Sequence, residues 1–342
     1  MRIAYLADSS PTATAQHRSA ALERLGHVVE RFNPWTALVH RRPSRLDYHT
    51  GYGLLQRDYQ AALKLWFAAR QGFWDLVWVD SGEWFGPRTV ALLRQCSEAK
   101  VVLYHIDDCT GKRDRRRFCS LRRALPQYDL CVSVRETTAL EMRALGARQT
   151  LRVWMSYDEI AHATTEADPS CSLGSCIGFI GTLIPGEGRD QLLLQLLRHG
   201  IPLVIWGPRW SHSRHWRRLQ PAHQGTFLSG SALRSAMAAP AACLGLLSRG
   251  NRDLHTTRSL EVPAAGGLLC AQRTSEHALL FEDGVEALLW DDSEQCQTLC
   301  SQVLADPAHA AEIRRAGHDR IQRFGGGNED ICRQILAHVE AI

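Results

Sequence analysis

The stretch RSLEVPAAGGLLCAQRTSEHALLFEDGVEALLW, Arg258–Trp290, contains the units from which the fold can be inferred. Apolar residues recur at helical spacing in RSLEVPAAG, and two glycines, Gly266 and Gly267, follow at once. The short apolar runs GLLCAQ and EALLW predict strands. The unit also opens with an arginine and a glutamate three residues apart, a placement that raises the question of a charged ligand.

The same alternation of strand and helix extends over most of the chain. Before this stretch, the runs RIAYLA, HVVERF, DLVWVD, KVVLYHIDD and YDLCVSV predict strands, and amphipathic segments between them predict helices. CIGFIG, IPLVIWG and ACLGLLS continue the pattern. Continuous apolar strands separated by helices are typical of a parallel sheet that is covered on both faces.

The alternation lapses once, in the polar segment YDEIAHATTEADPSCSLGS. We therefore predict an α/β protein with two facing Rossmann-like domains, residues 1–160 and 176–324, joined by a linker at 161–175. The triple glycine at 325–327 suggests that a final helix, within 325–342, crosses back to the first domain. A ligand should then bind between the domains, at the carboxyl ends of the strands.

Composition excludes several classes of protein. The chain has 342 residues, 45% hydrophobic and 22% charged, with a net charge of +4, which does not by itself indicate nucleic acid or a membrane. No apolar run approaches the ~20 residues that span a bilayer, and MRIAYLADSS predicts a strand rather than a signal peptide. We expect a cytoplasmic protein, with peripheral membrane contact left open.

The eleven cysteines do not show metal-site spacing. No pair has C-x-x-C spacing; Cys171 with Cys176, and Cys296 with Cys300, are spaced more loosely, and no histidine pattern accompanies them. We interpret the cysteines as small core residues in a reducing compartment, and we expect no metal and no cofactor.

Two segments of the second half have features of a phosphate site. In GFIGTLIPGEGRDQLL, Gly181 ends a strand and Arg189 begins a helix, where backbone N–H groups and a guanidinium suit a phosphate. In HTTRSLEVPAAGG, Thr256 and Thr257 lie where an N-cap is expected, with Arg258 and Glu261 on one side of the helix. A solvated arginine and an ordinary surface ion pair are the alternatives. Neither a dinucleotide fingerprint nor a P-loop is present.

These segments resemble the C-terminal half of glycosyltransferases of the GT-B architecture. RSLEVPAAGG followed by EHALLFEDGVEALLW is most similar to the CgeB-like, spore-maturation-type branch. The resemblance implies a nucleotide-diphosphate sugar as co-substrate, with Glu261 at the ribose and Arg258 and Arg189 near the diphosphate. It places Glu276 at the start of the next helix, and Asp253 where retaining relatives often have a second glutamate.

Acidic residues at strand ends of the first half are candidates for the chemistry. His105, Asp107 and Asp108 follow one predicted strand, and a carboxylate there could act as general base on an acceptor hydroxyl if the enzyme inverts. If it retains, no protein base is required. Asp80 and Glu83, at the end of the preceding strand, are a second acidic pair for acceptor binding, and turn-capping aspartates are the alternative.

The expected activity is that of a hexosyl- or pentosyltransferase acting on an acceptor hydroxyl. A sugar-nucleotide 2-epimerase and a non-catalytic sugar-nucleotide-binding module are the alternatives. The basic segment GKRDRRRFCSLRR, with Arg115, Arg116 and Arg117, suggests an anionic acceptor: a lipid-linked glycan, a phosphorylated saccharide or a nucleic acid. A solvated helix face would explain the same charges.

Overall fold

A computed structural model describes residues 1–10, 13–38, 43–70, 72–164 and 172–342. The chain divides into two compact units. Unit 1 comprises Met1–Trp154, Gly250–Arg252 and Asn328–Ile342, and unit 2 comprises Met155–Arg249 and Asp253–Gly327. Of the predicted linker, residues 165–171 lie outside the described part, and Ser172–Ser175 form a short 3-10 helix.

Unit 1 is built on a parallel sheet of six strands in the order β2-β1-β3-β4-β5-β6. The chain runs from β1 to β2 in one direction and from β2 to β3 in the other, so right-handed crossovers place α1 and α3 on opposite faces. The strands are β1 (Arg2–Leu6), β2 (Val28–Phe32), β3 (Leu76–Asp80), β4 (Lys100–His105), β5 (Leu130–Ser133) and β6 (Thr150–Arg152). The helices are α1 (Thr14–Arg24), α2 (Arg45–His49), α3 (Gln56–Ala68), α4 (Pro87–Ser97), α5 (Cys119–Ala124), α6 (Glu136–Ala144) and α14 (Asn328–Ala341).

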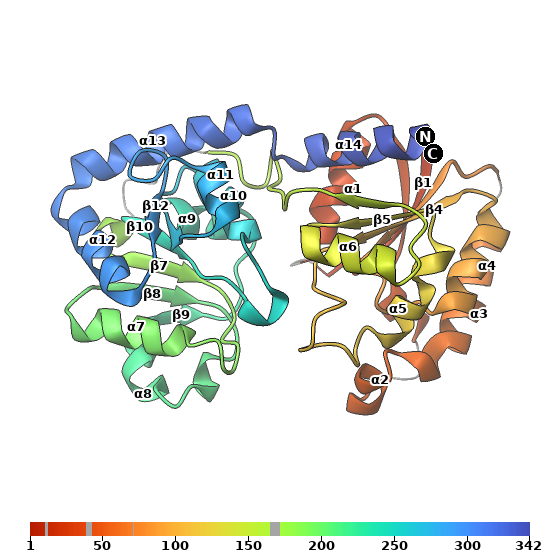
Figure 1. Ribbon diagram of the computed structural model, residues 1–342, viewed down its shortest axis with the longest axis horizontal. Coiled ribbons are helices and arrows are strands. Elements are labelled where there is room, and N and C mark those ends of the chain that lie inside the picture. Colours follow the sequence, from red (N-terminus) through yellow and green to blue (C-terminus); the bar gives the residue numbers. More distant parts are fainter. Residues whose placement is uncertain (11–12, 39–42, 71, 165–171) are drawn as a thin grey trace. The chain divides into compact units, whose positions relative to one another are not determined.

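Helix α14, at the end of the chain, belongs to unit 1 and packs against α1 (Figure 1). Its residues Ile331, Ile335 and Val339 are buried, because they recur at helical spacing on one face. Two polar contacts add to this packing. Arg24 forms an ion pair with Glu329, and Lys100 Nζ donates a hydrogen bond to the carbonyl oxygen of Val339 at 2.8 Å.

Unit 2 is built on a second parallel six-stranded sheet, in the order β12-β11-β10-β7-β8-β9. From β7 the chain proceeds outward to β8 and β9, and from β10 it proceeds outward on the other side to β11 and β12. The strands are β7 (Ile177–Ile180), β8 (Leu203–Trp206), β9 (His223–Gly225), β10 (Ala242–Gly245), β11 (Leu269–Gln272) and β12 (Leu288–Trp290). The helices are α7 (Arg189–Arg198), α8 (Trp216–Leu219), α9 (Gly230–Ala238), α10 (Thr257–Ala264), α11 (Ser275–Leu280), α12 (Ser293–Ala305) and α13 (Pro307–Phe324).

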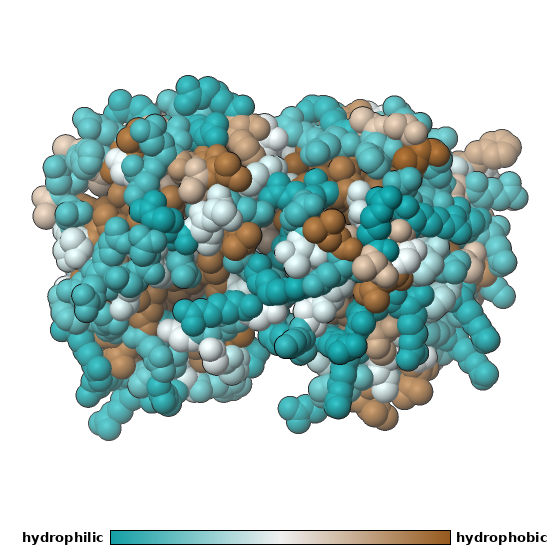
Figure 2. Space-filling model, viewed as in Figure 1, coloured by the Kyte–Doolittle hydropathy of each residue, from teal (hydrophilic) through white to brown (hydrophobic). Residues whose placement is uncertain are grey.

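Each unit contains one of the two parallel sheets predicted from the sequence, and apolar strand residues contribute to the core of each unit. Hydrophilic side chains cover most of the face shown in Figure 2, and hydrophobic ones appear in small separate areas. Among the helices that the structure describes, none combines the length and the hydropathy that a membrane-spanning helix needs.

Candidate functional site

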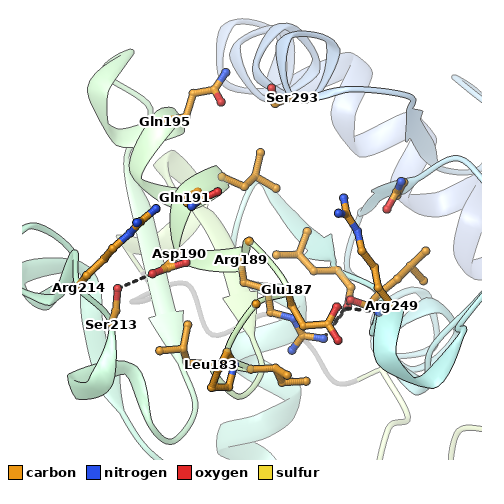
Figure 3. A pocket seen from close by; sticks show the side chains of 18 of the residues that line it. Leu183, Glu187, Arg189, Asp190, Gln191, Gln195, Ser213, Arg214, Arg249 and Ser293 are labelled. Atoms are coloured by element: carbon orange, nitrogen blue, oxygen red, sulfur yellow. Dashed lines mark hydrogen bonds between the residues drawn. The ribbon is translucent and has the colours of Figure 1, made fainter. Parts of the chain in front are cut away.

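A cavity of about 900 Å³ lies in unit 2, where the strand order reverses between β7 and β10. Loops that leave neighbouring parallel strands in opposite directions must separate there, and open α/β sheets bind ligands at this point. The volume is that of a site for a small molecule or cofactor. The wall comes from the β7–α7 and β10–α10 loops, the start of α7, the segment after β8, and the ends of β11 and β12 (Figure 3).

Glu187 links the β7–α7 loop to the β10–α10 loop by hydrogen bonds (Figure 3). Its carboxylate accepts hydrogen bonds from the Ser248 hydroxyl at 3.2 Å and from the backbone N–H of Arg249 at 2.7 Å. Asp253 in turn accepts a hydrogen bond from the backbone N–H of Ser248. The β10–α10 loop is therefore held by carboxylates on both sides, and Arg249 is left exposed at the cavity wall. Glu187 lies in the glycine-containing loop that the sequence singled out, but its role was not predicted.

Arg189 begins α7, as predicted, and lines the cavity. Its side chain is buried, and the guanidinium donates hydrogen bonds to the carbonyl oxygens of Thr182 at 2.9 Å, Leu246 at 3.4 Å and Leu247 at 3.1 Å. These carbonyls belong to the two loops that flank the strand reversal. In this structure Arg189 thus fixes the loop backbones, and its predicted contact with a diphosphate stays a prediction.

The end of β7 explains why Gly181 is a glycine. The residue after β8, Gly207, has φ +135°, and a Cβ atom there would lie 2.1 Å from the carbonyl oxygen of Gly181. A Cβ atom on Gly181 would meet the ring of Phe179 at 2.7 Å. The two loop backbones approach so closely here that side chains cannot be accommodated.

Helix α10 begins with a capping box. Thr256, one of the two predicted cap residues, is the N-cap, and its backbone N–H donates a hydrogen bond to the hydroxyl of Ser259. Ser259 also contacts Nε2 of His277 at 2.8 Å, while Nδ1 of His277 donates to the carbonyl oxygen of Gln272. Burial lowers the pKa of His277 to about 4, so the ring is neutral and Nε2 accepts the proton of Ser259. A buried network thus fixes the N-terminus of α10.

Arg258 and Glu261 form the predicted pair on one side of α10. Glu261 is only 2% exposed, and Nε2 of His162 lies 3.8 Å from its other oxygen. The alternative for this i,i+3 pair was an ordinary surface ion pair, but the carboxylate is buried and paired on two sides. Of the predicted donor-site residues, only Arg189 lines the cavity in the described part of the chain.

Glu276 lies in the first turn of α11, as predicted, and contacts a histidine that the sequence did not single out. Its Oε2 is 2.5 Å from Nδ1 of His255, and Nε2 of His255 accepts a hydrogen bond from the backbone N–H of Met155. Because Nε2 accepts, Nδ1 carries the proton and donates it to Glu276. His255 immediately precedes the cap of α10, so this contact also positions that helix.

The acidic residues of unit 1 differ in how many hydrogen bonds and ion pairs their carboxylates form within the protein. Asp108 accepts five hydrogen bonds, two from Arg252 and one each from Thr110, Gly111 and Thr138. Burial would raise the pKa of Asp108, but the hydrogen bonds from Arg252 outweigh it and hold the pKa below its usual value. Asp108 is therefore a fully bonded carboxylate in this structure.

Asp80 is similarly engaged, because Arg18 binds it with two nitrogens, at 2.7 and 2.9 Å, and the Tyr5 hydroxyl donates to it at 2.6 Å. Asp107 has a more open environment. Its side chain is 29% exposed, Asn251 Nδ2 donates to it at 3.3 Å, and Arg117 lies at 3.7 Å. Of these aspartates, Asp107 retains the most access to a hydroxyl outside the protein.

His105 ends β4 and is completely buried. Its Nδ1 donates a hydrogen bond to the carbonyl oxygen of Ser81 at 2.6 Å, its ring packs edge-on against Phe118, and burial lowers its pKa. Among the described residues, Nε2 of His105 has no hydrogen-bond partner. The ring is therefore neutral, with a free acceptor nitrogen.

The basic segment that begins at Gly111 lies mainly in turns, and only Cys119–Ala124 is helical, so a simple helix face does not describe it. Arg117 contacts the buried carboxylate of Glu83, whose pKa is raised by burial because that guanidinium offsets the effect only in part. Arg115 and Arg116 are exposed. Within the predicted patch, Arg117 thus forms an ion pair with a buried carboxylate, whereas Arg115 and Arg116 are exposed to solvent.

Comparisons with known proteins give a family match over part of the chain and several structural similarities. Residues 189–324 match the family model described as "Glycosyl transferase-like". A comparison with curated protein sequences finds no match. The structure of HepE from Anabaena, solved in complex with UDP, aligns over 100% of both chains with 15% identity and a TM-score of 0.64.

Two further solved structures share the fold at equally low identity. Sucrose-phosphate synthase from Thermosynechococcus elongatus aligns over 100% of this chain and 98% of its own, with 14% identity and a TM-score of 0.74. A trehalose-phosphate synthase from Burkholderia vietnamiensis aligns over 100% of both chains, with 13% identity and a TM-score of 0.65. The two parallel six-stranded sheets with their helices therefore have the α/β fold of GT-B glycosyltransferases.

Proposed function

We propose that this protein is a glycosyltransferase that moves a sugar from a nucleotide-diphosphate sugar to an acceptor hydroxyl. The observation that carries the proposal is the cavity at the strand reversal of unit 2, much of whose wall lies in the range that matches the glycosyl transferase-like model. The HepE structures that share this fold contain UDP or UDP-glucose, which favours a uridine nucleotide as donor. The CgeB-like branch stays a prediction.

In this proposal, unit 2 binds the nucleotide-sugar donor. Arg249 and the N-terminus of α7 supply positive charge at the cavity, where a diphosphate would be stabilised as it leaves. Arg258 and Glu261 lie outside the cavity wall, so their predicted contacts with the diphosphate and the ribose require the Arg258–Glu261 ion pair to open when the donor binds. Rate acceleration then comes from positioning the donor and from stabilising the negative charge on the leaving group. The transfer itself requires no metal in this proposal.

The acceptor side falls to unit 1, at the ends of β3 and β4. Asp107 is the general base if the transfer inverts the anomeric centre, because it is the more accessible carboxylate at the end of β4. The exposed Arg115 and Arg116 favour an acceptor that carries phosphate, such as a phosphorylated saccharide or a lipid-linked glycan. No groove-reading motif accompanies the basic segment, so nucleic acid is the less favoured acceptor.

The donor site is tested by a thermal-shift screen of the full chain with UDP, GDP, ADP, CDP and dTDP and their sugars. We expect UDP or a UDP-sugar to raise the unfolding temperature, since a ligand at 100 times its dissociation constant adds about 2.7 kcal/mol. Calorimetry then compares Glu261→Gln and Arg258→Ala with the exposed control Glu312→Gln. Each site variant should lose about 1.5–3 kcal/mol of nucleotide affinity, and the control none.

Because Arg258 pairs with the buried Glu261, each variant is first checked for its circular dichroism and unfolding temperature. Unchanged affinity in both folded variants would show that the donor site is wrongly assigned. Transfer is assayed by release of the nucleoside diphosphate with and without phosphorylated acceptors. Turnover of the donor without an acceptor would instead indicate an epimerase, and binding without any turnover would indicate a non-catalytic module.

A further inference from the structure

Three cysteines of unit 2 converge in its core. Cys270 lies in β11, and Cys296 and Cys300 lie in α12. Their sulfur atoms all lie within 4.8 Å of one another, and the side chains of all three are completely buried. Cys296 and Cys300 were not predicted as ligands, because they lack C-x-x-C spacing and no histidine pattern accompanies them. The third sulfur comes from a strand 26 residues away from Cys296 in the chain.

The scaffold explains why the three sulfurs meet. Cys296 and Cys300 are four residues apart on a helix, so they project from the same face of α12. That helix packs against β11 and β12, and β11 is hydrogen-bonded on both sides, to β10 and to β12. Cys270 is therefore held in an interior strand opposite the helical pair, and little backbone freedom remains to separate the three thiols.

The sulfurs face one another rather than the backbone. Cys243, a buried cysteine on the neighbouring strand, directs its thiol toward the carbonyl oxygens of Ala236 and Met237, at 3.6 and 3.4 Å. In the cluster, by contrast, the three sulfur atoms all lie within 4.8 Å of one another. A cysteine that only fills space in a core does not need sulfur partners.

The donor set and its surroundings select the kind of ion. All three donors are soft sulfur atoms, which favours Cu(I), zinc and iron–sulfur clusters over hard cations. A structural zinc site takes four ligands. Among the described residues, only three side chains that could bind a metal meet here, and all three are cysteines. Leu268, Leu288 and Val303 belong to the same buried apolar cluster, where net charge is costly.

A monovalent ion fits this environment best. When such an ion replaces one thiol proton, the proton leaves to solvent and the net charge of the cluster does not change. We propose that Cys270, Cys296 and Cys300 form a closed three-sulfur site for Cu(I) in the core of unit 2. The proposal does not depend on the glycosyltransferase activity, and it departs from the sequence-based expectation that the chain binds no metal.

The test uses the full chain, reduced and kept under argon. Cu(I) is supplied as its complex with a sulfonated bathocuproine, which competes for copper and removes it from weakly binding single thiols. Because the site is closed, loading is done both by long incubation of the folded chain and by refolding in the presence of the complex. We expect one copper per chain to be retained, with release of one proton and a higher unfolding temperature.

X-ray absorption on the loaded, unmutated chain counts the ligands directly, and we expect three sulfur neighbours. Cys296→Ala should weaken Cu(I) retention by at least about 100-fold, because it removes a ligand and not merely an outer partner of one. Cys243→Ala is the matched control, since it removes a buried cysteine of the same unit outside the cluster, and it should retain copper like the parent.

Three results would overturn the proposal. The first is that no copper is retained by either loading route. The second is that Cys296→Ala, shown to be folded, retains copper as well as Cys243→Ala does. The third is an absorption spectrum with nitrogen or oxygen in the ligand shell, or tighter retention of Zn(II) than of Cu(I) in direct competition. The ligand count is made on the unmutated chain, so it remains decisive even if a variant fails to fold.

Discussion

Replacing Arg252 with alanine should destabilise unit 1, because this side chain neutralises the buried Asp108. The guanidinium binds Asp108 at 2.6 and 2.8 Å and Glu141 at 2.6 and 2.9 Å. Asp108 is 0% exposed, whereas the side chains of Arg252 and Glu141 are 38% and 41% exposed. The same arginine therefore makes one ion pair with a buried partner and one with a solvated partner.

The expected cost follows from these exposures. Removing one member of a fully buried ion pair costs about 3–5 kcal/mol. Asp108 keeps its hydrogen bonds from Thr110, Gly111 and Thr138, and solvent screens the more than one-third exposed Arg252, so we expect about 2 kcal/mol. Glu141→Gln removes only the solvated partner and should cost about 0.5 kcal/mol or less.

The pH dependence gives a second check. The pKa of Asp108 is lowered in the folded chain, so its contribution to stability is complete above the unfolded value of about 3.9 and is lost as the pH falls below it. The difference between the parent and Arg252→Ala should therefore be constant from neutral pH down to about pH 5 and shrink below about pH 4.

Urea denaturation followed by circular dichroism measures these differences, and hydrogen exchange of β4 and α6 shows whether the loss falls in unit 1. A double-mutant cycle with Asp108→Asn isolates the coupling between the two side chains. The reasoning would be refuted if Glu141→Gln cost as much as Arg252→Ala, or if the coupling to Asp108 were near zero.

Three further predictions concern the proposed reaction and the donor unit. Asp107→Asn should lower kcat of an inverting transfer about 10²–10⁴-fold in steady-state kinetics, whereas a folded Asp108→Asn variant should largely keep it. Reversing Arg115 and Arg116 to glutamate should raise KM for an anionic acceptor at low salt and leave donor affinity intact; equal kinetics at every salt concentration would contradict this. Gly207→Ala should cost more than about 4 kcal/mol in urea unfolding, because its Cβ atom would meet backbone, whereas Gly200→Ala, with open space around it, should cost about 1 kcal/mol.

Much of the fold could be predicted because it depends on local patterns. Continuous apolar runs such as KVVLYH in β4 mark buried parallel strands, and Thr256 marks the start of α10 through its hydroxyl. The pairing of Arg258 with Glu261 followed from their spacing on one helix. By contrast, the three-residue strands β6 and β9 were missed, since so few residues carry no clear periodicity.

The candidate site was harder to predict because its contacts join distant segments. The sequence could place Arg189 at a helix start but could not show that its guanidinium reaches the carbonyls of Leu246 and Leu247. It could flag Asp108 at a strand end, but not the arginine 144 residues later that binds it. Cys270 and Cys296 are brought together by packing of α12 on β11, which no local spacing encodes.

The assignment of α14 to unit 1 has a consequence for how the chain matures during synthesis. Domains generally fold from the N-terminus while translation proceeds. Unit 1, however, needs Arg252 to neutralise Asp108, and it needs Asn328–Ile342 to cover α1. Because Asn328–Ile342 follow unit 2 in the chain, the apolar surface that receives Ile331, Ile335 and Val339 stays uncovered until the sequence beyond unit 2 has been synthesised. Unit 1 is thus completed only after unit 2 has been synthesised, and removal of Asn328–Ile342 would disturb the unit that contains the N-terminal half of this sequence.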